Sequence, residues 1–315
     1  MTIKTVALFG ANGNLGTVAL QSLVSSGHFR VTVIKRESSP YSLPPSLSTP
    51  SAPVALRTVD DALSPASLRA ALAGMDAVVV SIPLRDPAQH LRIADAAAAA
   101  GVRRVIPADY GSCDSDSPRA QALVPLFAHK AAVRARLQAL SATAAAAPGG
   151  DFSWTSLVVG HFFDWGLREN FLHFDLGART AEILDHGRYR SSTATLARVG
   201  EAVVRILAAD EEGTRNRVLF VQSFCVSQLD VLAALERATG GAKWEVRFVE
   251  SEAFIADRKG KADAGDKDAV EDLVFALGAL DGNWEGREGF AMDLLGLENE
   301  DLDEVVQRVV DSTQA

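Results

Sequence analysis

Residues 5–27, "TVALFGANGNLGTVALQSLVSSG", decide the fold of this chain. They begin with a short apolar, β-prone run, continue through a glycine-rich turn, and then repeat apolar residues at helical spacing until Gly27. A strand, a tight turn and a helix in this order are typical of the first unit of a nucleotide-binding sheet. The stretch therefore predicts an α/β fold with a nucleotide site at the turn.

The three glycines of the turn have distinct mechanical roles. Gly10 lets the chain turn, Gly13 lets the backbone approach a pyrophosphate, and Gly16 lets the helix pack closely on the strand. The alternative is a turn that is structural only, because this glycine pattern alone is a weak signal. We expect the cofactor to contact the turn and the start of its helix, which comprise Gly10, Asn12, Gly13, Asn14, Leu15 and Gly16.

The first half of the chain goes on alternating between strand and helix patterns. Further strands are predicted at residues 30–35, 55–60, 76–83 and 103–109, with helices between them at 64–74 and 88–101. Regular alternation of this kind predicts a Rossmann-type, doubly wound parallel sheet covered by helices on both faces. Such a sheet binds its ligands at the carboxyl ends of the strands.

The pattern loosens after about residue 150, where strand-like and helical segments continue into a carboxyl-terminal α/β part. We expect residues 1–155 to form the NADP-binding domain, with its sheet extended by strands near 155–160 and 217–222. Residues 160–315 are then expected to bind mainly the substrate. Four further segments have clear patterns, namely helices at 227–240 and 299–313, a Pro- and Ser-rich loop at 38–53 and a solvated charged segment at 257–269.

The end of the second strand favours NADPH over NADH. Arg36 lies where an NAD-binding site usually has an acid on the ribose hydroxyls, and an arginine there can pair with a 2′-phosphate. Lys35 and Ser38 add a charge and a hydrogen bond. The carboxylate of Glu37 next to Arg36 argues against a 2′-phosphate. The alternative is that Lys35 and Arg36 are only a solvated strand end. Ser81, at the end of the fourth strand, is a further cofactor candidate.

Bulk composition excludes several functions. The chain has 315 residues, 48% of them hydrophobic, with a net charge of −9, which opposes binding to nucleic acid. The sequence contains no apolar run long enough to predict a membrane span or a signal peptide. The separation of Cys113 and Cys225 matches neither a metal-ligand nor a disulfide spacing. The histidines also lack a metal-ligand spacing, so we expect no metal site. A cytoplasmic protein is the simplest interpretation.

Lys130 is the candidate catalytic residue. It lies in "VPLFAHKAAV", residues 124–133, about 20 residues beyond the fifth strand, so its helix should pass the carboxyl edge of the sheet. There its ammonium is expected either to hold the nicotinamide ribose or, with a pKa lowered by burial, to exchange protons with a substrate oxygen. A surface lysine with a snorkelling side chain is the alternative.

Several segments together resemble the isoflavone reductase-like branch of the NmrA-like, atypical short-chain reductases. The resemblance rests on "GANGNLG", "KRESS", "AAAAAGVRRVIPADYGS", "SWTSLVVGHFFDW" and "VSQLDVLAALERATGGAKWEV". The third segment resembles the family's stretch ending in Pro-Ser-Glu-Phe-Gly, and the fourth resembles its strand and Gly-x-Phe turn over the nicotinamide. The resemblance implies a Rossmann domain with a smaller substrate domain, NADPH as cofactor and a role in secondary metabolism.

The same resemblance implies roles for individual residues. The family uses a lysine downstream of Pro-Ser-Glu-Phe-Gly in place of a catalytic tyrosine, and this lysine corresponds to Lys130. Gly160 and Phe162 would lie beside the nicotinamide. The third and fourth of the quoted segments are the most specific matches. They contain the substrate candidates Tyr110, His161, Phe163 and Trp165.

The predicted function is reduction of a small aromatic or polyketide-type substrate at a ketone, enone or benzylic centre. Asp109 and Tyr110 replace the family's Glu-Phe pair, and the carboxyl-terminal third matches least well, so the substrate itself is not inherited from the family. One alternative is an NmrA-like redox-sensing regulator that binds NADP(H) without catalysis. Another is a dehydratase or isomerase on the same fold. We expect a monomer or a homodimer.

Overall fold

A seven-stranded parallel sheet forms the centre of the chain. The structure, a computed structural model, describes residues 2–47, 54–209 and 211–314. The strand order is β11-β6-β5-β4-β1-β2-β3. The bounds are β1 (Thr5–Phe9), β2 (Arg30–Arg36), β3 (Ala55–Val59), β4 (Ala77–Val80), β5 (Arg104–Ile106), β6 (Ser153–Val158) and β11 (Arg217–Phe220). Each neighbouring pair is parallel.

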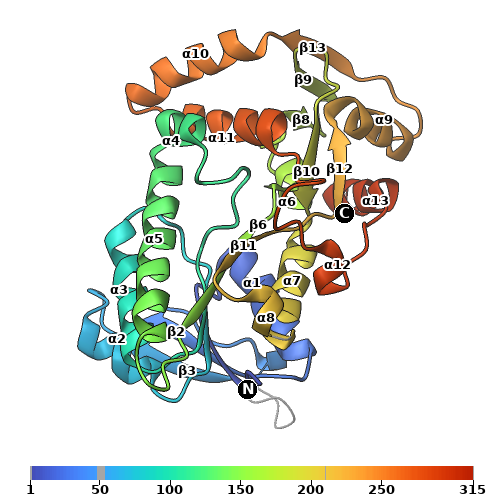
Figure 1. Cartoon of the computed structure of the whole chain (residues 1–315). Helices are drawn as coiled ribbons and strands as arrows, with labels where there is room; N and C mark the ends of the chain where they lie inside the picture. The colour runs from blue at the N-terminus through green and yellow to red at the C-terminus, as the bar shows by residue number, and fades with distance from the viewer. Residues whose placement is uncertain (1, 48–53, 210, 315) are drawn as a thin grey trace.

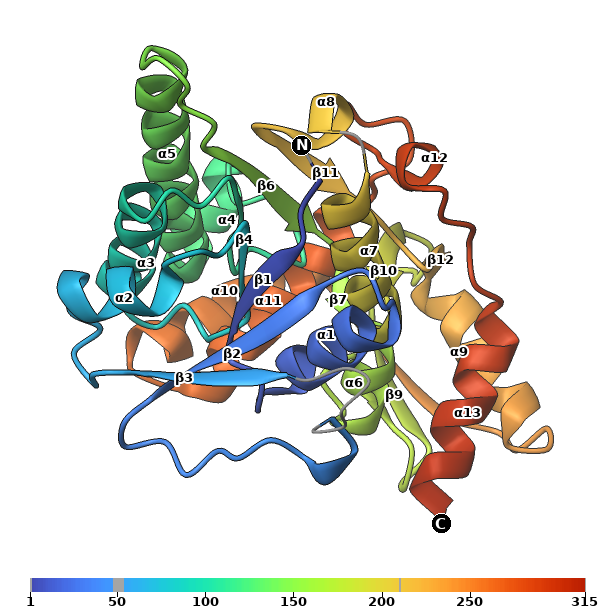
Figure 2. The ribbon, with the colours of Figure 1, turned by 90° about the horizontal axis from the view of Figure 1, so that it is seen from below.

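Helices cover both faces of this sheet (Figures 1 and 2). In β1, Val6 and Leu8 contribute to the core on one face, whereas Ala7 and Phe9 contribute to the core on the other. The first core lies under α1 (Asn14–Ser25) and α7 (Leu196–Ala208), which pack against each other. The second core lies under α2 (Pro65–Leu72), α3 (Pro87–Ala99) and α5 (Pro125–Ala145). The predicted doubly wound Rossmann-type fold is confirmed.

The strand order reverses at β1. This strand pairs with β2 on one side and with β4 on the other, so their two crossover connections leave in opposite directions. The Ser81 amide donates to the Phe9 carbonyl oxygen at 2.9 Å, which places the ends of β4 and β1 side by side. A reversal of this kind opens a crevice at the carboxyl ends of the strands.

The carboxyl-terminal part adds two small sheets and a third apolar core. One sheet has the order β12-β10-β7 and the other β13-β9-β8. Their strands are β7 (His161–Phe162), β8 (Phe174–Asp175), β9 (Thr180–Leu184), β10 (Arg190–Ala194), β12 (Phe224–Ser227) and β13 (Glu245–Val249). The helices and turns not yet given are α4 (Pro118–Leu123), α6 (Phe163–Arg168), α8 (Glu211–Thr214), α9 (Gln228–Ala238), α10 (Ser251–Asp263), α11 (Lys267–Asp281), α12 (Met292–Leu295), α13 (Leu302–Gln314) and the 3-10 turn η1 (Pro45–Leu47).

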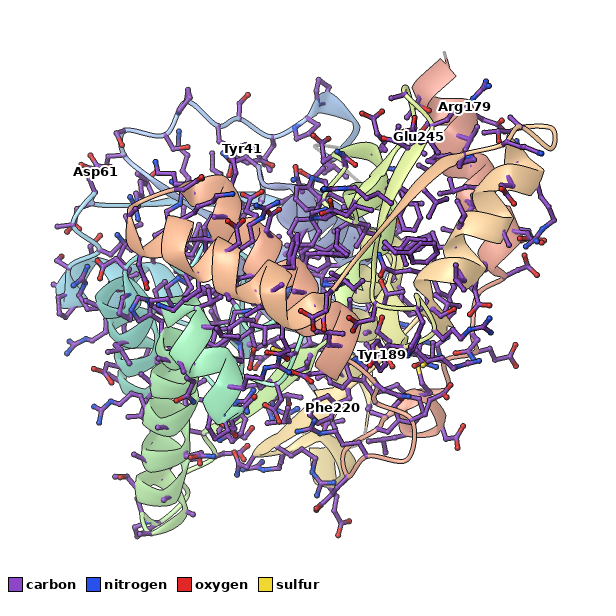
Figure 3. The ribbon with its side chains drawn as sticks, turned by 90° about the horizontal axis from the view of Figure 1, so that it is seen from above. Tyr41, Asp61, Arg179, Tyr189, Phe220 and Glu245 are labelled. Atoms are coloured by element: carbon purple, nitrogen blue, oxygen red, sulfur yellow. The ribbon has the colours of Figure 1, made fainter. Side chains whose placement is uncertain are left out.

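The helix α11 lies next to α10 above the carboxyl edge of the large sheet, close to α4 and the start of α5 (Figure 1). In Figure 3, Tyr41 and Asp61 lie on one side of the molecule and Arg179 and Glu245 at the opposite end, with α10 and α11 across the face between them. The helix α11, from the carboxyl-terminal part of the chain, therefore lies over the nucleotide-binding half.

The charged segment 257–269 is solvated, as predicted, and it is also helical. Within it, α10 extends to Asp263 and α11 begins at Lys267, with the Asp266 side chain accepting from the backbone amides of Asp268 and Ala269. Its side chains are mostly exposed, as expected. The loop predicted at 38–53 is irregular over residues 38–44 and forms η1 at 45–47, and residues 48–53 lie outside the described part.

Candidate functional site

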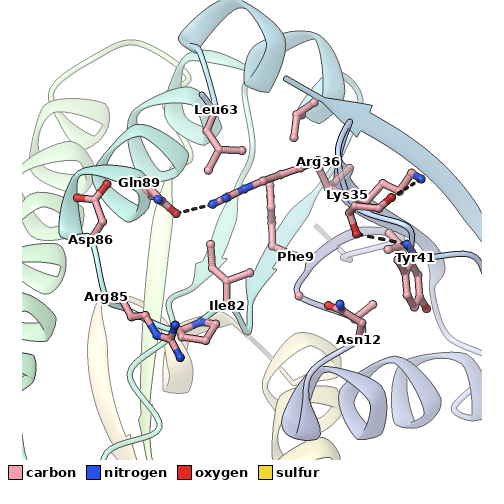
Figure 4. A pocket seen from close by; sticks show the side chains of 17 residues that line it. Phe9, Asn12, Lys35, Arg36, Tyr41, Leu63, Ile82, Arg85, Asp86 and Gln89 are labelled. Carbon is pink, nitrogen blue, oxygen red and sulfur yellow. Dashed lines mark hydrogen bonds between the residues drawn. The ribbon is translucent and has the colours of Figure 1, made fainter. Parts of the chain in front are cut away.

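Two cavities meet at the carboxyl edge of the sheet. The smaller cavity, of about 400 Å³, lies between the glycine-rich turn, the end of β2 and the loop after β4 (Figure 4). The larger cavity, of about 850 Å³, lies between the start of α1, the first turns of α5 and the face of α11. Both are lined by Ile82, Pro83 and Arg85. Their joint shape offers two compartments on either side of the loop after β4.

Cationic side chains line the smaller cavity. Arg36 Nη2 donates to Gln89 Oε1 at 2.6 Å, which fixes the guanidinium against α3 (Figure 4). Lys35 Nζ donates to the Ser39 carbonyl oxygen at 3.0 Å. Arg85 enters from the loop after β4. Three positive groups and one carboxylate, Asp86, give this cavity a net positive charge, which favours a ligand with phosphate groups.

The amino end of α1 supplies a second element for anion binding. The cap residue Gly13 has no side chain to accept from the first amides of the helix, and Gly13, Asn14 and Leu15 line the larger cavity. A Cβ on Gly16 would lie 1.8 Å from the Gly10 carbonyl oxygen, so only glycine allows this close packing. A Cβ on Gly10, whose φ is +84°, would lie 2.8 Å from the Ser81 backbone.

Lys130 lies on the inner face of α5 and lines the larger cavity. Its side chain is buried, with 9% of its surface exposed, and Nζ lies 5.4 Å from the centre of the Phe127 ring. Burial lowers the pKa of Lys130 from its usual range, and the nearby negative charge of Asp109 opposes that change. Within residues 2–47, 54–209 and 211–314, no side chain or carbonyl group accepts a hydrogen bond from Nζ.

A buried ion pair lies directly behind Lys130. Arg134, one helical turn further along α5, donates from Nη2 to Asp109 Oδ2 at 2.6 Å, and both side chains are buried. Ser156 Oγ of β6 also donates to Asp109 Oδ2. Arg134 Nη1 donates to Asp114 and Asp116 at 3.0 and 2.8 Å. The other Asp109 oxygen, Oδ1, is buried and has no hydrogen-bond partner in the described chain.

Two further polar groups of the larger cavity are neutral near pH 7. Burial lowers the pKa of His161 to about 4, so that its uncharged ring donates from Nε2 to the Val274 carbonyl oxygen at 3.4 Å. Burial raises the pKa of the Tyr110 hydroxyl. The Tyr110 and Ser81 hydroxyl oxygens are both buried without a hydrogen-bond partner of good geometry among the described residues. Neither His161 nor Tyr110 therefore carries charge into the cavity.

Most of the residues singled out from the sequence line one of the two cavities. Those at the smaller cavity are Gly10, Asn12, Lys35 and Arg36. Those at the larger cavity are Gly13, Asn14, Leu15, Ser81, Tyr110, Lys130, Gly160, His161, Phe162 and Trp165. Glu37 is exposed at the end of β2 and does not line the smaller cavity.

Three expected site residues line neither cavity. Gly16, expected at the cofactor, packs against the Gly10 backbone. Phe163 was expected at the substrate, but it is 1% exposed and packs edge-on against Phe224 in the carboxyl-terminal core. It follows Phe162 at the start of α6, so the two side chains leave the backbone in different directions. Ser38 was expected at the cofactor, but its hydroxyl donates to Asp61 at 2.6 Å, and it does not line either cavity.

The structure also brings in residues that the sequence pattern did not indicate. Arg85 and Gln89 follow β4, and Tyr41 lies in the Pro- and Ser-rich segment, where periodicity carries no signal. Val270, Glu271 and Val274 of α11 line the larger cavity although they are about 140 residues beyond Lys130 in the sequence. Of these residues, Arg85 alone could have been predicted from the sequence, because it is a basic residue in the loop that follows a strand.

Across the described residues, no cluster of His, Cys, Asp and Glu side chains has the geometry to hold a metal ion. No helix in that same part of the chain is long and apolar enough to cross a membrane. Cys113 and Cys225 are both free and buried.

Comparison with known proteins identifies the family. The model of the NmrA-like family matches residues 2–157. The chain is 33% identical to the oxidoreductase aprR of Aspergillus flavus over 252 aligned residues. The aligned stretch covers 80% of this chain and 79% of aprR. The chain belongs to the NmrA-like family, as the resemblance of its sequence segments predicts.

Solved structures share the fold. The chain matches AtPrR2, solved with NADP+ and (+)pinoresinol, with a TM-score of 0.75 and 18% identity over 98% of this chain and 99% of that one. It matches isoflavone reductase with a TM-score of 0.74 and 18% identity, over the same shares of the two chains. At this level of identity the likeness shows the common architecture of both parts of the chain.

Proposed function

We propose that this protein is an NADPH-dependent oxidoreductase that transfers hydride to a small aromatic or polyketide-type substrate, with Lys130 assisting proton transfer. One observation carries the proposal, namely that a buried lysine without a hydrogen-bond partner in the described chain lines an apolar cavity that adjoins a cation-lined one. The first cavity suits a flat apolar substrate and the second a phosphorylated nucleotide. The oxidoreductase name of aprR supports the same class.

The chain's own residues fit NADPH. The start of α1, whose first amides have no side-chain cap, lines the larger cavity beside the smaller one and would hold a diphosphate there. Arg36 and Lys35 line the smaller cavity, where they would recognise a 2′-phosphate. When bound, NADPH supplies the hydride. The solved structure of AtPrR2 with NADP+, on the same fold, supports this cofactor.

The larger cavity fits an aromatic substrate. Its walls are mostly apolar and aromatic, contributed by the first turns of α5, the turn at β7 and the face of α11. The apolar and aromatic residues that face it include Leu126, Phe127, Phe162, Trp165, Phe171 and Val274. A flat ring gains stability there because its apolar surface leaves water. Pinoresinol, the compound in the AtPrR2 structure, supports a phenolic class.

Lys130 is the group best placed to move a proton in this cavity. A ketone or enone that accepts hydride develops negative charge on its oxygen, and an ammonium group nearby stabilises that charge and donates a proton. The lowered pKa of Lys130 favours this donation, since a weaker hold on the proton brings it nearer to the working pH. His161, which is neutral and donates to a backbone carbonyl oxygen, is less suited to the role.

Replacement of Lys130 tests the proposal. We expect Lys130→Ala to lower kcat by about 10²- to 10⁴-fold for aromatic ketones or enones, because the general acid is lost. NADPH affinity, measured by fluorescence titration, should change by less than about tenfold, and Lys261→Ala on the exposed side of α10 is the matched control. Full activity of Lys130→Ala would reject the role. A wild-type protein that binds NADPH and NADP+ equally and turns over no substrate would favour the regulator instead.

A further inference from the structure

A small internal cavity separates Lys130 from the ion pair behind it. It is lined by residues of α3, α5, the end of β5 and β6, and its size leaves room for a single water molecule. The lining residues are Leu84, His90, Pro107, Ala108, Asp109, Lys130, Val133, Arg134 and Ser156. It is distinct from the two cavities of the proposed site, although Lys130 and Asp109 also line the larger one.

Among the described residues that line this cavity, Asp109 Oδ1 and Arg134 Nε are buried without a hydrogen-bond partner, and the carboxylate oxygen is the one that can accept from Lys130 through a water molecule. The Asp109 side chain is 3% exposed, and its other oxygen already accepts from Arg134 and Ser156. A buried carboxylate oxygen without a hydrogen bond costs free energy, and a water molecule is the usual partner where space for one exists. Asp109 and Lys130 make no direct ion pair, yet Asp109 is the main charge that opposes the lowering of the Lys130 pKa.

Counting charges shows why the cluster favours a protonated lysine. The carboxylates of Asp109, Asp114 and Asp116 contact Arg134, and Asp114 also contacts Arg287. Three negative and two positive groups leave one negative charge, which the Lys130 ammonium balances. Asp109 and Arg134 are its buried members, so removing the Asp109 carboxylate leaves an uncompensated buried charge.

The other titratable groups around Lys130 do not supply this balance. Burial lowers the pKa of His90 and raises the pKa of Cys113 to about 12, so both are uncharged near pH 7. Tyr110 is likewise a neutral phenol. The remaining titratable groups that line the larger cavity are Arg85, His129, His161, Lys267 and Glu271. Arg85 lies on the loop after β4 and also lines the smaller cavity, His161 is uncharged, and on α11 the acid and the base offset each other.

We propose that Asp109 is a positioning residue that holds the Lys130 ammonium through a single buried water molecule between Oδ1 and Nζ, with Arg134 and Ser156 fixing the carboxylate. This inference rests on the proposed function for its catalytic meaning, since Lys130 is the proton donor there. Asp109 itself does not touch the substrate in this role. Its charge keeps Lys130 protonated at neutral pH, against the cost of burial.

The test measures the ionisation of Lys130 directly. Protein labelled with ¹³C at the lysine ε carbon is titrated by NMR, and the Lys130 signal is assigned by its absence from Lys130→Arg. We expect Asp109→Asn to lower the titration midpoint of Lys130 by about one pH unit or more, because an opposite charge is lost. Asp109→Glu should restore the midpoint, since the longer side chain keeps the charge and reaches across the cavity.

A second variant tests the water molecule without changing any charge, and it can be used if Asp109→Asn does not fold. Val133→Ile adds one methylene group to the wall of the cavity, excludes the water molecule and leaves every charge in place. We expect the Lys130 midpoint to fall in this variant as well. The matched control is Asp230→Asn, which removes a capping carboxylate from α9 far from the cavity and should leave the midpoint unchanged.

The outcomes separate this inference from the proposed function. Lower midpoints in Asp109→Asn and Val133→Ile, with recovery in Asp109→Glu, support it. An unchanged midpoint in either of the first two variants overturns it. Because the NMR titration needs no turnover, a protein without reductase activity still decides the role of Asp109. Where turnover is found, the alkaline limb of the kcat profile should move with the midpoint, whereas a merely structural role would lower kcat equally at every pH.

Discussion

The smaller and larger cavities differ in how the chain builds them. The smaller one takes its wall from residues 9–12, 33–41, 59–63 and 82–89, all within the first ninety residues and all near strand ends. The larger one combines the start of α1, the start of α5, the turn at β7 and α11, which are separated by up to about 260 residues. Local motifs therefore specify the nucleotide compartment, whereas the substrate compartment depends on how distant elements pack.

The largest effect is expected at the wall of the larger cavity. The His161 pKa of about 4 lies below the ordinary value of 6.5, so the unfolded chain binds the proton more tightly than the folded one. This contribution to stability is complete above pH 6.5 and is lost as the pH falls towards 4, by about 3 kcal/mol. We expect His161→Phe to lack this part of the pH dependence in urea unfolding.

The control for His161 is His28→Asn, which changes an exposed ring on the nucleotide-binding half. The comparison of wild type with His161→Phe removes the effect of other titrating groups, which are common to both. Equal pH dependence in these two proteins would contradict a buried neutral histidine at this wall.

An intermediate effect is expected in the smaller cavity. Arg36→Ala removes the guanidinium that Gln89 fixes, and a hydrogen bond to a charged phosphate contributes about 2 kcal/mol. We expect NADPH affinity to fall by about 30-fold and NADH affinity to stay within a few-fold, measured as dissociation constants. Arg30→Ala, at the exposed start of the same strand, is the matched control. An unchanged ratio of the two constants would rule out recognition of a 2′-phosphate by Arg36.

The smallest effect is expected from narrowing the larger cavity. Val270 of α11 lines this cavity but not the smaller one, so Val270→Trp should fill substrate space and leave the contacts of the cofactor with the glycine-rich turn and with Arg36 in place. We expect KM for an aromatic substrate to rise by about tenfold, which corresponds to about 1.4 kcal/mol, with the NADPH dissociation constant unchanged. Lys261→Trp on exposed α10 controls for the added ring. A parallel loss of NADPH affinity would show that the two compartments are not independent.

The sequence predicted the large sheet well because each of its elements has a local signal. The strands at 30–35, 55–60 and 76–83 are short apolar runs between turn residues, and the helix start at Ser64-Pro65 is a side-chain cap in the structure. The small sheets were not predicted, since β7 and β8 have two residues each and carry no periodic pattern. Segment 257–269 was predicted only as solvated because its charges conceal two helices joined at Asp266.

The candidate site divides in the same way. Lys35 and Arg36 were predicted as cofactor residues from their place at the end of the second strand, and the glycines from the turn after the first. Lys130 was predicted from its distance beyond the fifth strand. Phe163 was predicted at the substrate as one of the apolar residues of "GHFFDWGL", but α6 begins there and its side chain lies in the core. Such a choice between two neighbouring aromatic rings depends on the direction of one backbone turn, which the pattern of residues does not contain.

By itself, the sequence determined the order of strands and helices, the glycine-rich turn and the positive charge at the end of β2, because hydrophobic periodicity, turn chemistry and charge act between near neighbours. The tertiary structure alone decided that Asp109 and Arg134 lie behind Lys130 and that α11 covers the larger cavity. The burial that shifts the pKa of a lysine or a histidine arises only where elements far apart in the chain pack together and exclude water.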